Sequence, residues 1–126
     1  MEQISILIID DEKKFATMLA KRIELRGCNC EICYDGKTAI DWIKKNADSV
    51  TLILLDLQLP DIYGTQVLTM IKEINSTIPV IILTGHGTEQ DRQQCDELGA
   101  YMFMHKPLSI DKLMSIVEHI KEMREC

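Results

Sequence analysis

The feature that most constrains this chain is a run of four aliphatic residues, Leu52–Leu55, that ends directly in Asp56. A short uninterrupted run of this kind, followed soon afterwards by Pro60, predicts a strand that is buried on both faces. Strands of that type belong to open parallel sheets, which bind their ligands at the carboxyl ends of the strands. The sequence therefore predicts that Asp56 lies at a ligand-binding edge.

Four other short apolar runs also end in polar residues, and each predicts a further strand. They are Ile6–Ile9 before Asp10 and Asp11, Cys28–Cys33 before Tyr34 and Asp35, Val80–Leu83 before Thr84, and Met102–Met104 before His105 and Lys106. Because parallel strands end at one edge of a sheet, we expect five side chains to converge there: Asp10, Asp11, Asp56, Thr84 and Lys106.

Amphipathic segments alternate with these strands and predict five helices. Their expected ranges are about 13–26, 37–46, 65–75, 88–98 and 110–123. Apolar residues three and four apart place Phe15, Met18, Leu19 and Ile23 on the inward face of the first helix. The alternation of strand and helix predicts right-handed crossovers and an α/β fold, a three-layer, doubly wound, five-stranded parallel sheet.

Two of the predicted elements differ from their neighbours. The second strand, about 29–33, is less apolar than the others, so we expect it at an edge of the sheet. The helix over 88–98 is mostly polar and has only Cys95 and Leu98 as clear anchors. Helices with few buried anchors are the ones that move most readily.

Length and charge limit the possible functions. At 126 residues we expect one domain, residues 1–126, with a single substantial core. A net charge of -6 argues against a nucleic-acid surface. No apolar run approaches the length of a membrane span, and the first residues lack the basic start of a signal peptide, so we expect no membrane association and a cytoplasmic protein.

Three of the five cysteines, Cys28, Cys30 and Cys33, lie close together in the sequence and raise the question of a metal site. On a strand, Cys28 and Cys30 share one face while Cys33 points to the other. No further Cys or His follows at ligand spacing. Small buried strand residues with reduced thiols are the favoured interpretation.

The three acidic residues of the predicted edge indicate a divalent cation. Asp10, Asp11 and Asp56 would repel one another when unpaired, and a hard cation relieves that repulsion. Oxygen ligands select Mg²⁺, or Mn²⁺ in its place, over zinc, and the backbone carbonyl of Gln58 is a further candidate ligand. The alternative is that Asp11 or Glu12 simply caps the following helix.

The remaining residues of this edge suit an anion with several oxygens. Lys106 supplies a positive charge, Thr84 supplies a hydroxyl, and Gly85 has no side chain to block an approaching oxyanion. Together with a metal, these groups suit phosphoryl transfer in which one carboxylate attacks phosphorus.

These motifs, in this order, give the chain a resemblance to the receiver domain of bacterial response regulators, the CheY-like domain of two-component systems. The matching pieces are the acid pair Asp10 and Asp11, the segment from Leu55 to Pro60 around Asp56, Thr84 with its two neighbours, and Lys106 before Pro107. The resemblance implies a flavodoxin-like sheet in the order 2-1-3-4-5 and a cis peptide between Lys106 and Pro107.

The same resemblance implies a function. Asp56 is expected to accept a phosphoryl group from the phosphohistidine of a sensor histidine kinase or phosphotransfer protein. Metal ligation is expected from Asp11, Asp56 and the Gln58 carbonyl, with Asp10 acting through a water. Self-phosphorylation and slow autodephosphorylation are expected, without turnover of an external substrate.

The switch of such a domain is expected to involve Thr84 and an aromatic residue three positions before the lysine, here Phe103. Phenylalanine departs from the commoner tyrosine and has no hydroxyl to anchor it. The output face would consist of the fourth helix, fifth strand and fifth helix, which could contact an output domain or a second copy of the chain. Gln58 and His86 are expected to flank the path of the hydrolytic water, so they should tune the lifetime of the phosphoryl group.

Three alternative functions fit these residues less well. A haloacid-dehalogenase-like phosphatase needs a carboxylate two residues after the nucleophile, and Gln58 cannot transfer a proton. A flavodoxin needs a hydroxyl-rich phosphate loop where this chain has Asp10, Asp11 and Glu12. A binding module that kept only the fold would have no reason to retain the acids, the threonine and the lysine together.

Overall fold

The computed structural model of the protein describes residues 3–125, and five strands alternate with five helices along them. The elements are β1 (Ser5–Ile9), α1 (Lys13–Leu25), β2 (Asn29–Cys33), α2 (Gly36–Asn46), β3 (Leu52–Leu55), α3 (Gly64–Ile74), β4 (Val80–Thr84), α4 (Glu89–Glu97), β5 (Met102–His105) and α5 (Ile110–Glu125). The helix ends follow local chemistry. Asp35 accepts a hydrogen bond from the Thr38 amide at the start of α2, and α1 is followed by Gly27 at a φ of 87°.

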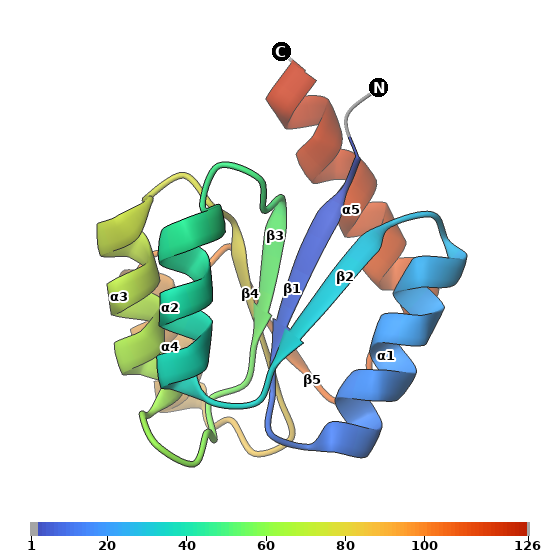
Figure 1. Ribbon diagram of the computed structural model, residues 1–126. Coiled ribbons are helices and arrows are strands. Elements are labelled where there is room, and N and C mark those ends of the chain that lie inside the picture. Colours follow the sequence, from blue (N-terminus) through green and yellow to red (C-terminus); the bar gives the residue numbers. More distant parts are fainter. Residues whose placement is uncertain (1–2, 126) are drawn as a thin grey trace.

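All strand pairs are parallel, and the sheet has the order β2-β1-β3-β4-β5. The expected three-layer, doubly wound architecture and strand order are therefore confirmed. β2 lies at one edge, as its lower apolar content predicted, and β5 lies at the other. The carboxyl ends of the strands meet at the bottom of Figure 1, away from both termini.

Two hydrophobic cores pack on the two faces of the sheet. α1 and α5 cover one face, while α2, α3 and α4 cover the other (Figure 1). The central strands β1, β3 and β4 are almost entirely buried because they contribute side chains to both cores. Packing on both faces holds the central strands in place, and with them the edge of the sheet formed by their carboxyl ends.

One expectation about α1 is wrong. Met18 was placed on its inward face, but its side chain is 40% exposed, whereas Ala16 and Ala20 are buried beside Leu19 and Ile23. The buried face of α1 therefore includes the small residues Ala16 and Ala20, which let the helix lie close to the sheet. Within the described residues, no helix is both long enough and apolar enough to cross a membrane.

Candidate functional site

The acidic residues predicted at the sheet edge lie together. Asp10 follows β1 and Asp56 follows β3, and these adjacent strands bury the two carboxyl groups to 3% and 4% exposure. Asp11 is exposed, and one carboxylate oxygen from each of the three residues lies within 4.8 Å of the others. Asp10 also accepts a hydrogen bond of 2.9 Å from the Glu12 amide.

Lys106 is the cation of this site. Its Nζ lies 2.8 Å from Asp10 Oδ2, 3.0 Å from Glu12 Oε1 and 3.2 Å from Asp56 Oδ2. The β5–α5 connection brings the lysine there, and its peptide bond to Pro107 is cis, as the resemblance implied. One ammonium group therefore faces three carboxylates.

Burial and the neighbouring charges together shift the pKa values of Asp10 and Lys106. Burial raises the pKa of Asp10 more than the hydrogen bond from Lys106 and the bond from the Glu12 amide lower it. Burial alone would lower the pKa of Lys106, but the hydrogen bonds to Asp10 and Glu12, together with the negative charges of Asp10 and Asp56, outweigh burial and raise it. The lysine is thus firmly cationic, while the crowded acids would gain from a further positive charge.

The three acids fit a hard divalent cation. All the side-chain donors are carboxylate oxygens, they come from two adjacent strand ends, and Asp11 is open to solvent. Oxygen donors of this kind suit a divalent ion such as Mg²⁺, Mn²⁺ or Ca²⁺. The alternative role of Glu12 as a helix cap is not observed, because its side chain makes no capping hydrogen bond and instead contacts Lys106.

Thr84 and Phe103 lie on neighbouring strands and meet at Gly87. Thr84 is completely buried at the end of β4, and its Oγ1 accepts a 3.4 Å hydrogen bond from the His86 amide. A Cβ atom at Gly87 would lie 2.3 Å from Phe103 Cζ and 2.8 Å from Thr84 Cγ2. Only glycine leaves room for both side chains at this point. His105 packs edge-on against Phe103 and contacts the Gly87 carbonyl.

The two residues expected to tune hydrolysis are at the surface of the site. Gln58 and His86 are both exposed. The backbone N–H of Gln58 donates a 3.3 Å hydrogen bond to Asp56 Oδ1, so the main chain of this residue contacts the candidate acceptor directly. His86 is tied to the site through the hydrogen bond of its amide to Thr84.

The loop after Asp56 is held by contacts that sequence analysis missed. A Cβ at Gly64 would lie 2.7 Å from the Asp56 carbonyl oxygen, so α3 starts in close contact with the end of the strand that leads to Asp56. Asp61 accepts hydrogen bonds from the amides of Gly36 at 2.8 Å and Lys37 at 2.9 Å. This carboxylate clamps the loop of residues 57–63, the candidate acceptor loop, to the start of α2.

Two contacts of Lys106 were also missed. Glu12 was considered only as a cap, and Phe15 only as a core residue, yet both touch the ammonium group; the Phe15 ring centroid is 4.5 Å from Nζ. A third acid directly after the acid pair was the available signal for Glu12. No signal in the sequence pointed to Phe15.

The cysteine cluster forms no metal site in the described part of the chain. Cys28 and Cys30 belong to the core beneath α1 and α5, while Cys33 belongs to the opposite core, as the strand geometry predicted. Burial raises the pKa of Cys30 to about 12 and of Cys33 to about 11, so both are neutral thiols.

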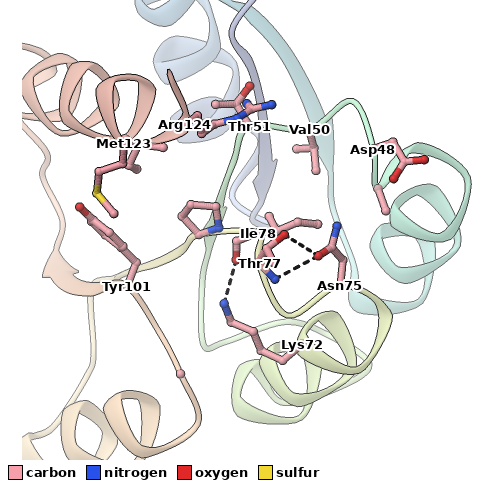
Figure 2. A pocket seen from close by; sticks show the side chains of 14 residues that line it. Asp48, Val50, Thr51, Lys72, Asn75, Thr77, Ile78, Tyr101, Met123 and Arg124 are labelled. Carbon is pink, nitrogen blue, oxygen red and sulfur yellow. Dashed lines mark hydrogen bonds between the residues drawn. The ribbon is translucent and has the colours of Figure 1, made fainter. Parts of the chain in front are cut away.

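Apart from the acidic site, a hollow lies at the other end of the sheet, where the strands begin (Figure 2). It has a volume of about 470 Å³, and three of its polar side chains, those of Lys72, Asn75 and Thr77, make local hydrogen bonds. Lys72 Nζ donates a 2.8 Å hydrogen bond to the Ile78 carbonyl, and Asn75 Oδ1 accepts from the amide and hydroxyl of Thr77. These contacts secure the turn between α3 and β4, and the cluster of acids is far from them in the fold.

Comparisons with known proteins agree with the fold and identify the family. The model of the response regulator receiver domain family matches residues 6–118. The transcriptional regulatory protein CpxR of Escherichia coli is 34% identical over 115 residues, which are 91% of this chain and 48% of CpxR. A putative response regulator, NtrX-like, of Rickettsia typhi is 32% identical over 123 residues, which are 98% of this chain and 26% of that protein.

A similar solved structure is the CheX–CheY–BeF₃–Mg²⁺ complex from Borrelia burgdorferi. The matched chain is 27% identical, with a TM-score of 0.87, and the match covers 94% of this chain and 90% of that one. The chain thus spans about half or less of the two curated relatives, and nearly all of this structural neighbour. With the family match over residues 6–118, the chain belongs to the response regulator receiver domain family.

Proposed function

We propose that this protein is a phosphoacceptor switch in which Asp56 receives a phosphoryl group from the phosphohistidine of a sensor histidine kinase. The observation that carries the proposal is the placement of Lys106 Nζ 3.2 Å from Oδ2 of the nearly buried Asp56, at the carboxyl end of a central strand. Membership of the receiver family supports the same role.

In the proposed reaction, a carboxylate oxygen of Asp56 attacks the phosphorus atom. The new bond joins that oxygen to phosphorus, and the bond from phosphorus to the histidine nitrogen breaks. The imidazole leaves with the electron pair and takes a proton from solvent. Lys106 pairs with an oxygen of the transferred group, and the Thr84 hydroxyl is the candidate donor to another.

A divalent metal at the acids completes the proposed site. Mg²⁺, or Mn²⁺ in its place, would be held by Asp11, Asp56 and the Gln58 carbonyl, with Asp10 acting through a water. The fit of three carboxylates supports a divalent ion, and the similar complex from Borrelia burgdorferi names Mg²⁺. When bound, the metal neutralises negative charge on the phosphoryl oxygens.

The proposed conformational response runs from Thr84 to Phe103. A phosphoryl group that draws the Thr84 hydroxyl toward it would disturb the packing of both side chains on Gly87. The face formed by α4, β5 and α5 would then change. α4 suits this role because Cys95 is its one fully buried side chain, whereas α3 buries five residues.

The signal is expected to end by slow autodephosphorylation, tuned by Gln58 and His86, without turnover of an external substrate. We further propose that residues 1–126 act as one receiver domain in the cytoplasm. The proposed partners are a sensor kinase or phosphotransfer protein and, through the output face, either an output domain or a second copy. No direct contact with nucleic acid or membrane is proposed.

The test is incubation of the protein with a small phosphodonor and Mg²⁺, with the Asp56→Asn variant as the matched control. We expect the wild type to gain one acid-stable, base-labile acyl phosphate and the variant to gain none. Continuous release of phosphate from added phosphate esters would instead support the phosphatase alternative. An unlabelled wild type that is folded and binds Mg²⁺ would favour a binding module.

A further inference from the structure

We propose that Phe15 is a positioning residue that holds the ammonium group of Lys106 over Asp56. The inference rests on the proposed function, because the position of Lys106 matters only if Asp56 is the acceptor. It assigns a role to a helix residue that makes no contact with the phosphoryl group itself.

The geometry places the lysine between two kinds of surface. Three carboxylates lie within 3.2 Å of Nζ, and the ring of Phe15 lies 4.5 Å away, measured to its centroid. Phe15 is in the first turn of α1, and its side chain is partly buried against the core beneath α1 and α5. The ring is therefore anchored in a packed layer, and it faces an ammonium group at the end of a long side chain that is 10% exposed.

One of the three acids, Glu12, can draw the lysine away from Asp56. Glu12 is 58% exposed, so a lysine that follows Glu12 would move toward solvent. A long side chain also gains rotamer freedom by leaving a crowded site. An aromatic face attracts a cation and excludes water from that side, which opposes this movement.

Phosphorylation would increase the need for such a support. The lysine must then bind an oxygen of the phosphoryl group while keeping Asp10 as its second anchor. If the ring contacts the lysine better in its phosphoryl-bound position than elsewhere, that contact shifts the equilibrium between the resting and the activated conformation toward the activated one. Loss of the ring should weaken the response, while the nucleophile itself stays intact.

The experiment compares Phe15→Leu, which keeps an apolar side chain, with Phe15→Tyr, which keeps the aromatic face. The first readout is solvent exchange of the Lys106 ammonium protons, measured by NMR in the unphosphorylated protein. We expect Phe15→Leu to hasten this exchange about three- to tenfold, in the range of a lost cation–π contact, and Phe15→Tyr to restore the wild-type rate. Equal rates in the wild type and Phe15→Leu would overturn the proposal.

A matched packing control is Tyr101→Leu. Tyr101 is also an aromatic residue packed against the same core, but it lines the hollow at the opposite end of the sheet. We expect this substitution to leave the exchange of the Lys106 protons unchanged. If it hastens exchange as much as Phe15→Leu does, general loosening of the core explains the effect and the positioning role is wrong.

The second readout is the change in amide exchange of residues 84–106 on phosphorylation, in a double-mutant cycle with Lys106→Ala. A residue that acts through Lys106 has nothing to position once the ammonium group is gone. We therefore expect Phe15→Leu to weaken the response in the wild-type background and to add no further loss to Lys106→Ala. Additive losses would contradict the proposal.

The results that would contradict the phosphoacceptor role differ from those that would contradict the role of Phe15. A wild type that takes no label at Asp56, or a Lys106→Ala variant with a normal response, would contradict the proposed function. The ammonium exchange rates would still decide, without any phosphorylation, whether Phe15 holds Lys106.

Discussion

At the scale of single residues, the site buries a carboxyl group, Asp10, whose charged form is destabilised by that burial. Asp10 is 3% exposed, and this burial raises its pKa above the ordinary value of 3.8. The hydrogen bonds from Lys106 and from the Glu12 amide oppose the shift but do not cancel it. The folded protein therefore binds a proton more readily than the unfolded chain does. Without metal, stability from this group falls as pH rises from 3.8 through the raised pKa.

Asp10→Asn should consequently stabilise the metal-free protein at neutral pH. The gain expected from relieving a functional site of this kind is about 1 kcal/mol. Added Mg²⁺ should stabilise the wild type more than the variant, because the metal compensates a charge that the variant lacks. Urea unfolding with a chelator and with excess Mg²⁺ measures both differences; a variant that is less stable without metal would show that the Asp10–Lys106 pair outweighs the burial of Asp10.

His86 offers a second test at this scale. Its side chain is exposed and its backbone amide is hydrogen-bonded to Thr84, and we propose that its ring covers a phosphoryl group on Asp56. On that basis His86→Ala should hasten dephosphorylation by about tenfold, which corresponds to about 1.4 kcal/mol of barrier. The decay of the phosphorylated protein, with donor removed and Mg²⁺ in excess, gives the rate. Slower decay would mean that His86 orients the water, and an unchanged lifetime would exclude it from the site.

At the scale of elements, the acceptor loop is attached to α2 by one side chain. Burial alone would raise the pKa of Asp61, but the amides of Gly36, Lys37 and Ile62 outweigh it and hold that pKa below 3.8. The contribution of Asp61 to stability is thus complete above 3.8 and is lost as pH falls through the lowered pKa. The carboxylate also meets the positive end of the helix dipole.

Asp61→Ala should destabilise the protein by about 1 kcal/mol, the usual effect of a lost helix cap. The matched control is Asp35→Ala, which removes the hydrogen bond to the Thr38 amide at the same helix end but leaves the acceptor loop attached. Both variants should lose similar stability in urea, and only Asp61→Ala should also slow labelling of Asp56. Equal labelling rates in the two variants would show that the clamp serves stability alone.

The elements also show what a sequence can and cannot predict. Strand ends and helix ends follow local patterns, so Asp10, Asp56, Thr84 and Lys106 were placed at one edge from apolar runs alone. Met18 was misplaced because apolar spacing favoured it over the small residues that bury better beside the sheet. The contacts Asp61–Gly36 and Phe15–Lys106 join loops and helices distant in sequence, and no periodic pattern records such pairs.

At the scale of the whole molecule, the site lies where the two cores meet the end of the sheet. α1 and the β5–α5 connection bring Phe15 and Lys106 from one side, and the α2–α3 side holds the acceptor loop through Asp61 (Figure 1). Asp56 itself is carried by a central strand that is buried in both cores. A change at Asp56 therefore touches both layers of helices at once.

We propose that Asp56 carries the phosphoryl group, and the position of the modified aspartate in the chain can be measured directly. After reaction with a small phosphodonor in Mg²⁺, borohydride reduction converts a phosphorylated aspartate to homoserine, which peptide mass spectrometry locates. We expect homoserine at position 56 and unmodified aspartate at positions 10 and 11. Homoserine at position 10 or 11, with Asp56 unmodified, would contradict it.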